Sequence, residues 1–404
     1  MDSAIRARRR LAKIPQYLVA VSAVALLATT LTASATNKGK KPIVTVEQGN
    51  FYVGGTLNAA GRMVGQMYVE YQIPDNRKKI PIVLIHGGGQ IGAGWNQTPD
   101  GRDGWRQYFL RQGYAVYVVD QPGRGRSPYD SDLGTVNNAG TSLRIRTLFA
   151  HPEDFPGLWP AAYLHTRWVG PAVDGDPTFY QFHASQSDSV GNQENLTAAG
   201  LVALLDKIGP AILIPHSQPG PHTYRAADLR PHLIKAIVNI EPGPGPLTTR
   251  IPGFGTPGPV AAPIWGLTSG PMTYSPPVTD PAQLGLVPKA VTDDPYVTEC
   301  WAQTEPAHKL VNLAKVPMML LTSEAGYNTL WDPCTYRYLV QAGVRPDWVR
   351  LEKIGIHGNS HFMFIENNSD QIAGLVQKWI EKRVKVGGGH DHDDDDDDDH
   401  GHHH

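Results

Sequence analysis

The strongest constraint on the fold is the alternation of strand-like and helix-like patterns through the middle of the chain. The strand-like runs are short, apolar and mostly rich in β-branched residues, and they cover Met67–Ile73, Ile80–Ile85, Tyr114–Val119, Ala211–Ile214, Ile234–Ile240, Pro317–Leu321 and Trp348–Leu351. Segments with the apolar spacing of amphipathic helices lie between many of them, at Gly104–Gln112, Glu194–Ile208, Trp331–Gly343 and Gln371–Val384. Buried strands that alternate with helices predict a mostly parallel sheet with helices on both faces. Right-handed crossovers then favour a doubly wound α/β topology.

Two long segments interrupt this alternation. Residues 128–192 are rich in aromatic side chains, and residues 243–312 are dense in Pro and Gly. Loops of this length usually form lids or binding loops rather than simple connections. Because open α/β sheets bind ligands at the carboxyl ends of their strands, we expect both segments to cap that edge; surface decoration is the alternative. The predicted pocket is apolar, with Trp95, Trp159 and Phe179 as candidate walls.

The first 35 residues have the features of a secretory signal peptide. They begin with a basic stretch, continue with an apolar run from Leu18 to about Leu31, and end in the small-residue cleavage signal Ala33-Ser34-Ala35. The apolar run approaches the roughly 18 residues that span a bilayer, so an uncleaved anchor is the alternative. We expect a secreted or periplasmic protein with no stable membrane span after cleavage.

Composition separates the end of the chain from the rest. Residues 387–404 are a Gly/His/Asp tract, which we expect to be a disordered, solvated tail; loose binding of divalent metal is the alternative. The 354 residues between the signal peptide and the last 15 residues hold 31 basic and 29 acidic side chains. A surface that binds nucleic acid is normally basic, so this balance argues against nucleic acid as a partner. With the signal peptide and the tail set aside, the strand and helix pattern leads us to expect one domain over residues 36–386.

Cys300 and Cys334 are the only cysteines of the chain. In an oxidising compartment, two cysteines suggest a single disulfide. The sequence leaves open whether their Cα atoms approach to the ~4.4–6.8 Å that a bridge requires.

Ser217 is the candidate nucleophile. The run Ala211–Ile214 continues into Pro215-His216-Ser217-Gln218-Pro219-Gly220 and then into a helix-compatible segment. A serine at a sharp strand-to-helix turn exposes its hydroxyl at the edge of the sheet, near a helix N-terminus. The usual G-x-S-x-G pattern fails because both flanking positions are proline, so an ordinary turn serine is the alternative. Pro219 is nonetheless compatible with a first helical turn, which needs no hydrogen bond from its nitrogen.

A glycine-rich turn supplies a second feature of a hydrolytic site. His86-Gly87-Gly88-Gly89-Gln90 follows the strand-like run Ile80–Ile85. Glycines let backbone N–H groups face a ligand, and the N–H groups of Gly88 and Gln218 would then form an oxyanion hole. His86 and Gly89 become candidates for the pocket lining. A plain turn and a phosphate-binding loop are the alternatives, although neither G-K-[ST] nor G-x-G-x-x-G is present there.

The candidate base and acid lie later in the chain. A serine nucleophile needs a histidine within hydrogen-bond reach, and in the order Ser–acid–His only His357 and His361 come late enough. His361 is favoured because an apolar Phe-Met-Phe-Ile run leads from it toward the last helix. Glu241 and Glu324 each follow a strand-like run after Ser217. Geometry allows either as the acid, which orients the imidazole and stabilises its cation.

Together these motifs resemble the α/β-hydrolase superfamily, and most closely a small group of exported bacterial carboxylesterases with an H-S-Q nucleophile turn. The resemblance covers most of residues 42–384 and rests on His86-Gly87 with Gln90-x-Gly92, Thr98-Pro99-Asp100-Gly101-Arg102 before Gly104-Trp105, Val119-Asp120-Gln121-x-Gly123-Arg124-Gly125-Arg126-Ser127, His216-Ser217-Gln218, Glu241-Pro242-Gly243 and His357-Gly358-Asn359-Ser360-His361. On its residues alone, the third of these motifs is interpreted as a tight loop outside the chemistry. Six linked motifs in one order make the signal specific. The chain departs from the group at Pro219, at its three consecutive glycines and in a long insertion after Gly243.

The resemblance implies an α/β-hydrolase fold and a triad of Ser217 as nucleophile, Glu241 as acid and His361 as base. It is the resemblance, and not spacing, that favours Glu241 over Glu324. It further implies a small-molecule carboxylic ester as substrate, an acyl-enzyme, and no need for a cofactor or metal. A lactonase or amidase with the same triad is the first alternative, because fold and triad are shared across these reactions. A catalytically dead secreted binding protein is the second.

Overall fold

The computed structural model describes residues 40–155, 157–190, 193–250 and 258–384. The predicted signal peptide at 1–35 and the predicted tail at 387–404 lie outside these ranges. No helix within the described ranges is long and apolar enough to cross a membrane.

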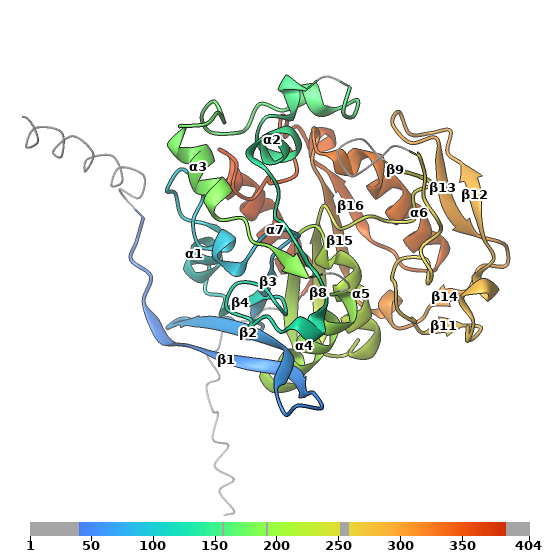
Figure 1. Ribbon diagram of the computed structural model, residues 1–404, viewed down its shortest axis with the longest axis horizontal. Helices are drawn as coiled ribbons and strands as arrows, with labels where there is room; N and C mark the ends of the chain where they lie inside the picture. The colour runs from blue at the N-terminus through green and yellow to red at the C-terminus, as the bar shows by residue number, and fades with distance from the viewer. Residues whose placement is uncertain (1–39, 156, 191–192, 251–257, 385–404) are drawn as a thin grey trace, which may run out of the picture. The chain divides into compact units, whose positions relative to one another are not determined.

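An eight-stranded sheet organises the described residues (Figure 1). Its strands lie in the order β1 (Thr45–Leu57), β2 (Met63–Pro74), β4 (Val116–Asp120), β3 (Ile82–Ile85), β7 (Ala211–Pro215), β8 (Ile234–Ile240), β15 (Met318–Thr322) and β16 (Asp347–Arg350). The six strands from β4 to β16 are parallel, whereas β1 and β2 pair antiparallel with their neighbours. This is the mostly parallel sheet expected from the sequence, and each strand-like run falls on one of its strands. Strand β7 lies between parallel neighbours, so its carboxyl end opens onto the middle of the ligand-binding edge.

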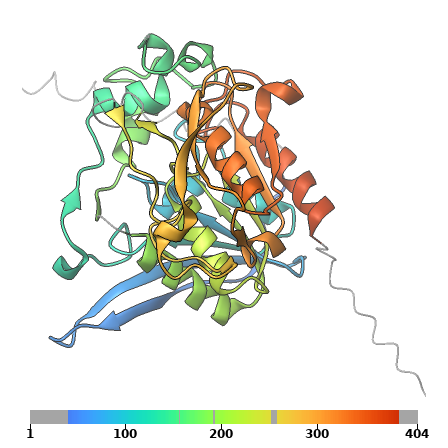
Figure 2. The ribbon, with the colours of Figure 1, turned by 90° about the vertical axis from the view of Figure 1, so that its right-hand side faces the viewer.

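Strand β1 is the sheet strand that the apolar pattern did not predict. It contains two consecutive glycines, and only one of its 13 residues is buried. It pairs with β2 over almost its whole length, and Figure 2 shows this hairpin reaching beyond the rest of the sheet. Backbone pairing rather than burial therefore holds β1, which explains why hydrophobic periodicity gave no signal for it.

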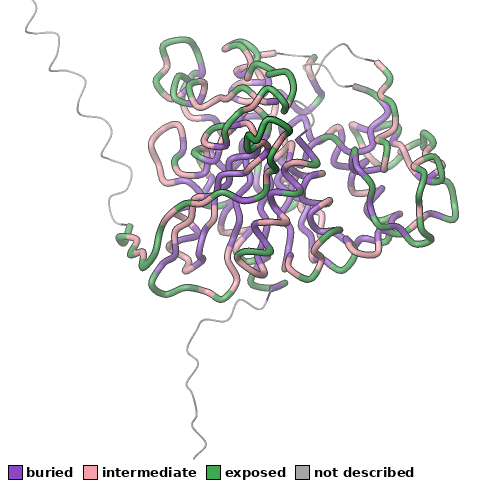
Figure 3. The backbone as a smooth tube through the Cα atoms, turned by 60° about the horizontal axis from the view of Figure 1, so that its bottom comes forward, coloured by how far each residue is buried: buried purple, intermediate pink, exposed green. Residues whose placement is uncertain are grey.

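Helices cover both faces of the sheet, as alternation along the strands requires. In β3, Ile82 and Leu84 belong to the core on one face, where α1 (Trp105–Arg111) and α7 (Ser369–Arg383) pack. Val83 and Ile85 belong to the core on the other face, which is covered by α4 (Glu194–Ile208), α5 (Pro219–Leu229) and α6 (Asp332–Gln341). Figure 3 shows the buried backbone concentrated at this centre and the exposed backbone in the surrounding loops.

The two long segments contain only short elements. Residues 128–192 form β5 (Val136–Asn137), α2 (Ser142–Ile145), α3 (Pro177–Ala184) and β6 (Ser189–Val190) together with single turns. Residues 243–312 form β9 (Thr249–Arg250), β10 (Gly258–Pro259), β11 (Tyr274–Ser275), β12 (Leu286–Ala290), β13 (Glu299–Gln303) and β14 (Lys309–Leu310). A disulfide joins Cys300 of β13 to Cys334 of α6, with a Cα–Cα distance of 5.3 Å. The predicted cysteine pair thus ties the second segment to a helix of the core.

Candidate active site

Ser217 lies at a sharp turn between β7 and α5. Its φ of 62° is in the left-handed region, which is uncommon for a residue with a side chain and matches the strained turn of a nucleophile elbow. Pro219 occupies the first position of α5, where its missing N–H costs nothing. Gly220 is required by packing, because a Cβ there would lie 2.5 Å from Cβ of Pro242. Pro219, one of the two prolines that break the usual motif, is therefore compatible with the elbow geometry.

His361 and Glu241 form a buried pair beside this turn. Glu241 follows β8 with a φ of 43°, and its Oε2 lies 2.7 Å from Nδ1 of His361. Its Oε1 accepts hydrogen bonds from the backbone N–H of Ser323, at 2.8 Å, and from the Ser323 hydroxyl. This arrangement fixes the imidazole so that Nε2, the other ring nitrogen, is left for a substrate or nucleophile.

Burial controls the protonation of this pair. It lowers the pKa of His361 well below 6.5, which keeps the imidazole neutral and able to accept a proton. Burial also raises the pKa of Glu241 to about 7, although the two hydrogen bonds from Ser323 act in the opposite direction. His361 is therefore a neutral imidazole that can accept a proton, and the neighbouring Glu241 carboxylate loses its charge in mildly acidic solution.

Glu324, the alternative acid, lies against the other histidine. Its Oε1 is 2.9 Å from Nδ1 of His357, and its Oε2 accepts the N–H of Gly358 at 2.7 Å. The His357 side chain is 61% exposed. Among the hydrogen bonds of the described residues, Glu324 makes none with His361. Glu324 therefore shapes the loop that precedes His361.

Ser217 and His361 both line a cavity of about 590 Å³. Its wall comes from the glycine turn, the elbow, the E-P-G turn, both long segments, the connection between β15 and α6, and the loop of His361. The lining residues are Gly88, Gly89, Asn138, Ala139, Arg144, Phe149, Gln186, Ser189, Ser217, Gln218, Gly243, Pro244, Leu247, Val260, Tyr327, Trp331, His361 and Phe362. Within the described part of the chain, the backbone N–H groups of Gly88 and Gln218 have no protein acceptor. Two unpaired donors beside a candidate nucleophile are what an oxyanion hole requires.

Of the predicted lining residues, Gly89 lines the cavity and four others do not, which corrects the expectation. His86 is buried behind the glycine turn, where Nε2 accepts the backbone N–H of Gln121 at 3.0 Å. Trp95 stacks on Phe364, and Phe179 is buried in the same core. Trp159 donates to the carbonyl of Ala325. Large aromatic residues pack into a hydrophobic core as readily as into a pocket wall. Composition alone therefore could not tell which of these residues would line the cavity.

Aromatic rings that the sequence did not single out surround His361. Tyr327 and Phe149 lie against the His361 ring, with centroid distances of 4.3 and 5.8 Å, and both line the cavity. Burial and the charge of Glu241 raise the pKa of Tyr327 well above 10, while a hydrogen bond with the Ser217 side chain opposes the rise. Tyr327 follows β15 in a segment without strand or helix periodicity, so nothing in the sequence pointed to it.

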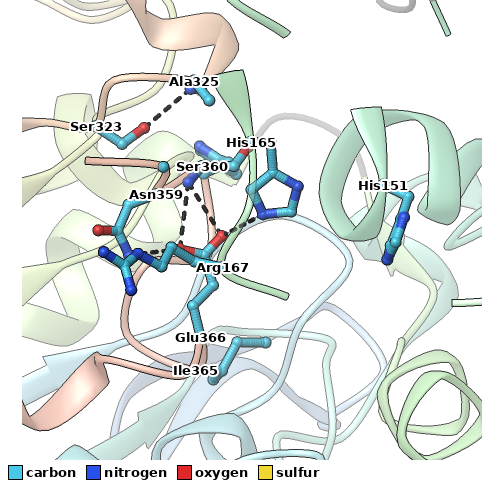
Figure 4. A network of polar contacts seen from close by, with 12 residues as sticks. His151, His165, Arg167, Ser323, Ala325, Asn359, Ser360, Ile365 and Glu366 are labelled. Atoms are coloured by element: carbon cyan, nitrogen blue, oxygen red, sulfur yellow. Dashed lines mark hydrogen bonds and ion pairs between the residues drawn. The ribbon is translucent and has the colours of Figure 1, made fainter. Parts of the chain in front are cut away.

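A second polar network holds the loop that carries His361 (Figure 4). The carboxylate of Glu366 is fully buried and accepts the N–H of Ser360 at 3.0 Å and the side-chain amide of Asn359 at 2.6 Å. Its Oε1 also lies 2.9 Å from Nε2 of His165, whose Nδ1 is 2.8 Å from Glu153. Burial lowers the pKa of His165, but the two carboxylates outweigh it and raise the pKa to about 9. A protonated histidine from residues 128–192 therefore clamps that segment to the loop that carries His361.

No metal site was found in the described ranges, where no group of three or more His, Cys, Asp or Glu residues is placed to hold an ion.

Comparison with known proteins identifies the family. No family profile matches the chain. A probable secreted lipase, phiG, from Fungal sp. (strain ATCC 74256) is 40% identical over 341 residues, which cover 82% of this chain and 89% of the relative. The chain belongs to the α/β-hydrolase superfamily. A solved structure described as a novel bacterial esterase matches with 25% identity and a TM-score of 0.59, over 86% of this α/β-hydrolase chain and 99% of its own.

Proposed function

We propose that this α/β-hydrolase is a secreted carboxylic ester hydrolase that works through an acyl-enzyme on Ser217. The observation that carries the proposal is the buried His361–Glu241 pair at 2.7 Å, next to a serine at a positive-φ elbow on the same cavity. The lipase and esterase names of its relatives support ester bonds as the target. Export is proposed from the sequence features of residues 1–35 and from the word secreted in the relative's name.

Each residue of the triad has one task. Ser217 Oγ attacks the ester carbonyl while Nε2 of His361 takes its proton, and the C=O electron pair moves onto oxygen. Glu241 stabilises the imidazolium that forms, and the N–H groups of Gly88 and Gln218 stabilise the oxyanion. His361 then gives its proton to the departing alcohol. Water, deprotonated by His361, attacks the acyl-enzyme in the same way and releases the acid.

The cavity sets limits on the substrate. It is large enough for a drug-sized molecule, and its wall combines the apolar side chains of Leu247, Val260 and Trp331 with backbone and amide groups. We infer an ester with a substantial apolar part on at least one side of the scissile bond. Both long segments contribute to this wall, so we propose that they are caps that determine which substrates bind.

Substitution of the triad tests the proposal with a chromogenic short-chain ester. Ser217→Ala should abolish hydrolysis, and activity close to that of the wild type would refute the assignment. Glu241→Gln should lower kcat by about 10⁴-fold, as loss of a triad acid does in other serine hydrolases. Glu324→Gln is the matched control, since it alters a carboxylate that contacts His357 instead of His361. A larger loss for Glu324→Gln would reverse the assignment of the acid.

A further inference from the structure

We propose that Arg124 is a positioning residue that holds both halves of the oxyanion hole and strengthens its Gly88 donor. The inference rests on the proposed function, because it assigns a task within the same site. Arg124 belongs to the D-x-x-G-x-G-x-S loop after β4, which on its residues alone was interpreted as a tight loop outside the chemistry.

The guanidinium lies between the two halves of the hole. Arg124 is 2% exposed, and its Nη1 donates to the carbonyl of Gly87 at 2.9 Å. Its Nη2 donates to the side-chain Oε1 of Gln218 at 2.6 Å. The planar fork of a guanidinium suits this task, because two donors at a fixed spacing set the distance between their two acceptors.

The contact with Gly87 acts directly on an oxyanion donor. The Gly87 carbonyl and the Gly88 N–H belong to one planar trans peptide, so they point in opposite directions. A cation bound to the carbonyl fixes where the N–H points and polarises the peptide, which makes the N–H a stronger donor; cooperative strengthening is about 10–30% per bond. Arg124 therefore acts on the oxyanion through the Gly88 amide.

His86 reinforces the same carbonyl. Its Nε2 accepts the N–H of Gln121, so its Nδ1 carries the proton and donates to the Gly87 carbonyl at 3.0 Å. Burial and the charge of Arg124 lower the pKa of His86 to about 4, which keeps this tautomer neutral. Two buried side-chain donors thus converge on the carbonyl of the peptide that carries the Gly88 N–H.

The glycine turn and the elbow lie close enough for one guanidinium to contact both. A Cβ on Gly87 would lie 2.9 Å from Nδ1 of His216, and a Cβ on Gly88 would lie 3.6 Å from Oε1 of Gln218. The glycine turn and the elbow are therefore in direct contact, without a side chain between them. No carboxylate of the described residues forms an ion pair with Arg124, so its charge is left to act on neutral dipoles. Uncompensated positive charge in a buried site favours the negative oxyanion.

Arg124→Met tests the inference by removing the charge and both hydrogen bonds. Loss of a whole oxyanion donor costs 10²–10³ in kcat, and weakening of one should cost about 10- to 100-fold. KM should change little, and the inhibition constant of a trifluoromethyl ketone, which binds as a hemiketal oxyanion, should rise in proportion to the loss in kcat/KM. Arg124→Lys should recover part of the loss. Gln218→Met, which breaks one contact and leaves the cation, should show a smaller loss of the same kind.

Arg126→Met is the control, because this neighbouring guanidinium pairs with Glu70 and Asp120 and not with the hole. The inference is overturned if folded Arg124→Met keeps its kcat, or if it loses kcat/KM without losing affinity for the ketone. If Arg124→Met does not fold, the Gln218→Met data decide by the same two criteria. Phosphonate labelling of wild-type Ser217 distinguishes failure of the proposed function from failure of the role of Arg124. If Ser217 is not labelled, both the proposed function and the inference about Arg124 are wrong. If Ser217 is labelled, the variants test the role of Arg124 alone.

Discussion

Raising the pH should loosen the clamp that His165 forms between residues 128–192 and the loop that carries His361, the proposed base. His165 is fully buried between Glu153 and Glu366, and its pKa is about 9 in the folded protein against 6.5 in the unfolded chain. Between these two values the folded state keeps a proton that the unfolded state loses, so the free energy of unfolding falls as the pH rises. A difference of about 2.5 pKa units corresponds to about 3 kcal/mol. The contribution is fully present below pH 6.5 and lost above about pH 9.

Urea denaturation of the wild type and His165→Gln at a series of pH values between 6 and 10 isolates this contribution. Other groups titrate in the same range, but they do so in both proteins and cancel in the difference. The stability advantage of the wild type should shrink by about 3 kcal/mol from pH 6 to pH 9.5. Glu153→Gln, which removes one of the two carboxylates, should show a smaller change. Parallel curves for wild type and His165→Gln would refute the reasoning.

Three further predictions concern the proposed acid, the disulfide and the cavity. Because burial raises the pKa of Glu241 to about 7, kcat/KM should fall as the pH drops through that value, and a pH–rate profile that stays flat to pH 5 would contradict it. The Cys300–Cys334 bridge closes a loop of 34 residues, so the double alanine variant should lose about 3–4 kcal/mol in thermal or urea unfolding; an unchanged Tm would be inconsistent with this. Leu247→Trp should narrow the cavity and raise KM for long-chain esters while sparing acetate esters, which an acyl-length panel would reveal.

The sequence predicted the parts of the fold that burial controls. The interior strands of the sheet are continuous apolar runs, and β8 and α4 have the predicted bounds. Strand β1 escaped detection because most of its side chains are exposed and backbone pairing holds it. The long segments could only be recognised as interruptions, since their short elements depend on contacts with the rest of the chain and not on local periodicity.

Local sequence alone was enough to propose part of the candidate site. Ser217 and His361 stand at turns marked by glycine and by strand ends, whereas the choice of Glu241 over Glu324 came from a resemblance. The sequence did not identify Tyr327 and Arg124 as site residues, because their positions depend on how separate loops meet in space. Arg124 lies in a loop that looks purely structural, and only the two hydrogen bonds across to Gly87 and Gln218 link it to the proposed oxyanion hole.

The most direct test of the central claim is covalent labelling of Ser217. An alkyl fluorophosphonate should add one phosphonyl group to the wild-type protein, and peptide mass spectrometry should place it on the peptide that contains Ser217. The Ser217→Ala variant should remain unlabelled, and Glu241→Gln should react much more slowly than Glu324→Gln. Labelling of Ser217→Ala at the wild-type rate, or no labelling of a folded wild type, would contradict the assignment of this serine as the nucleophile.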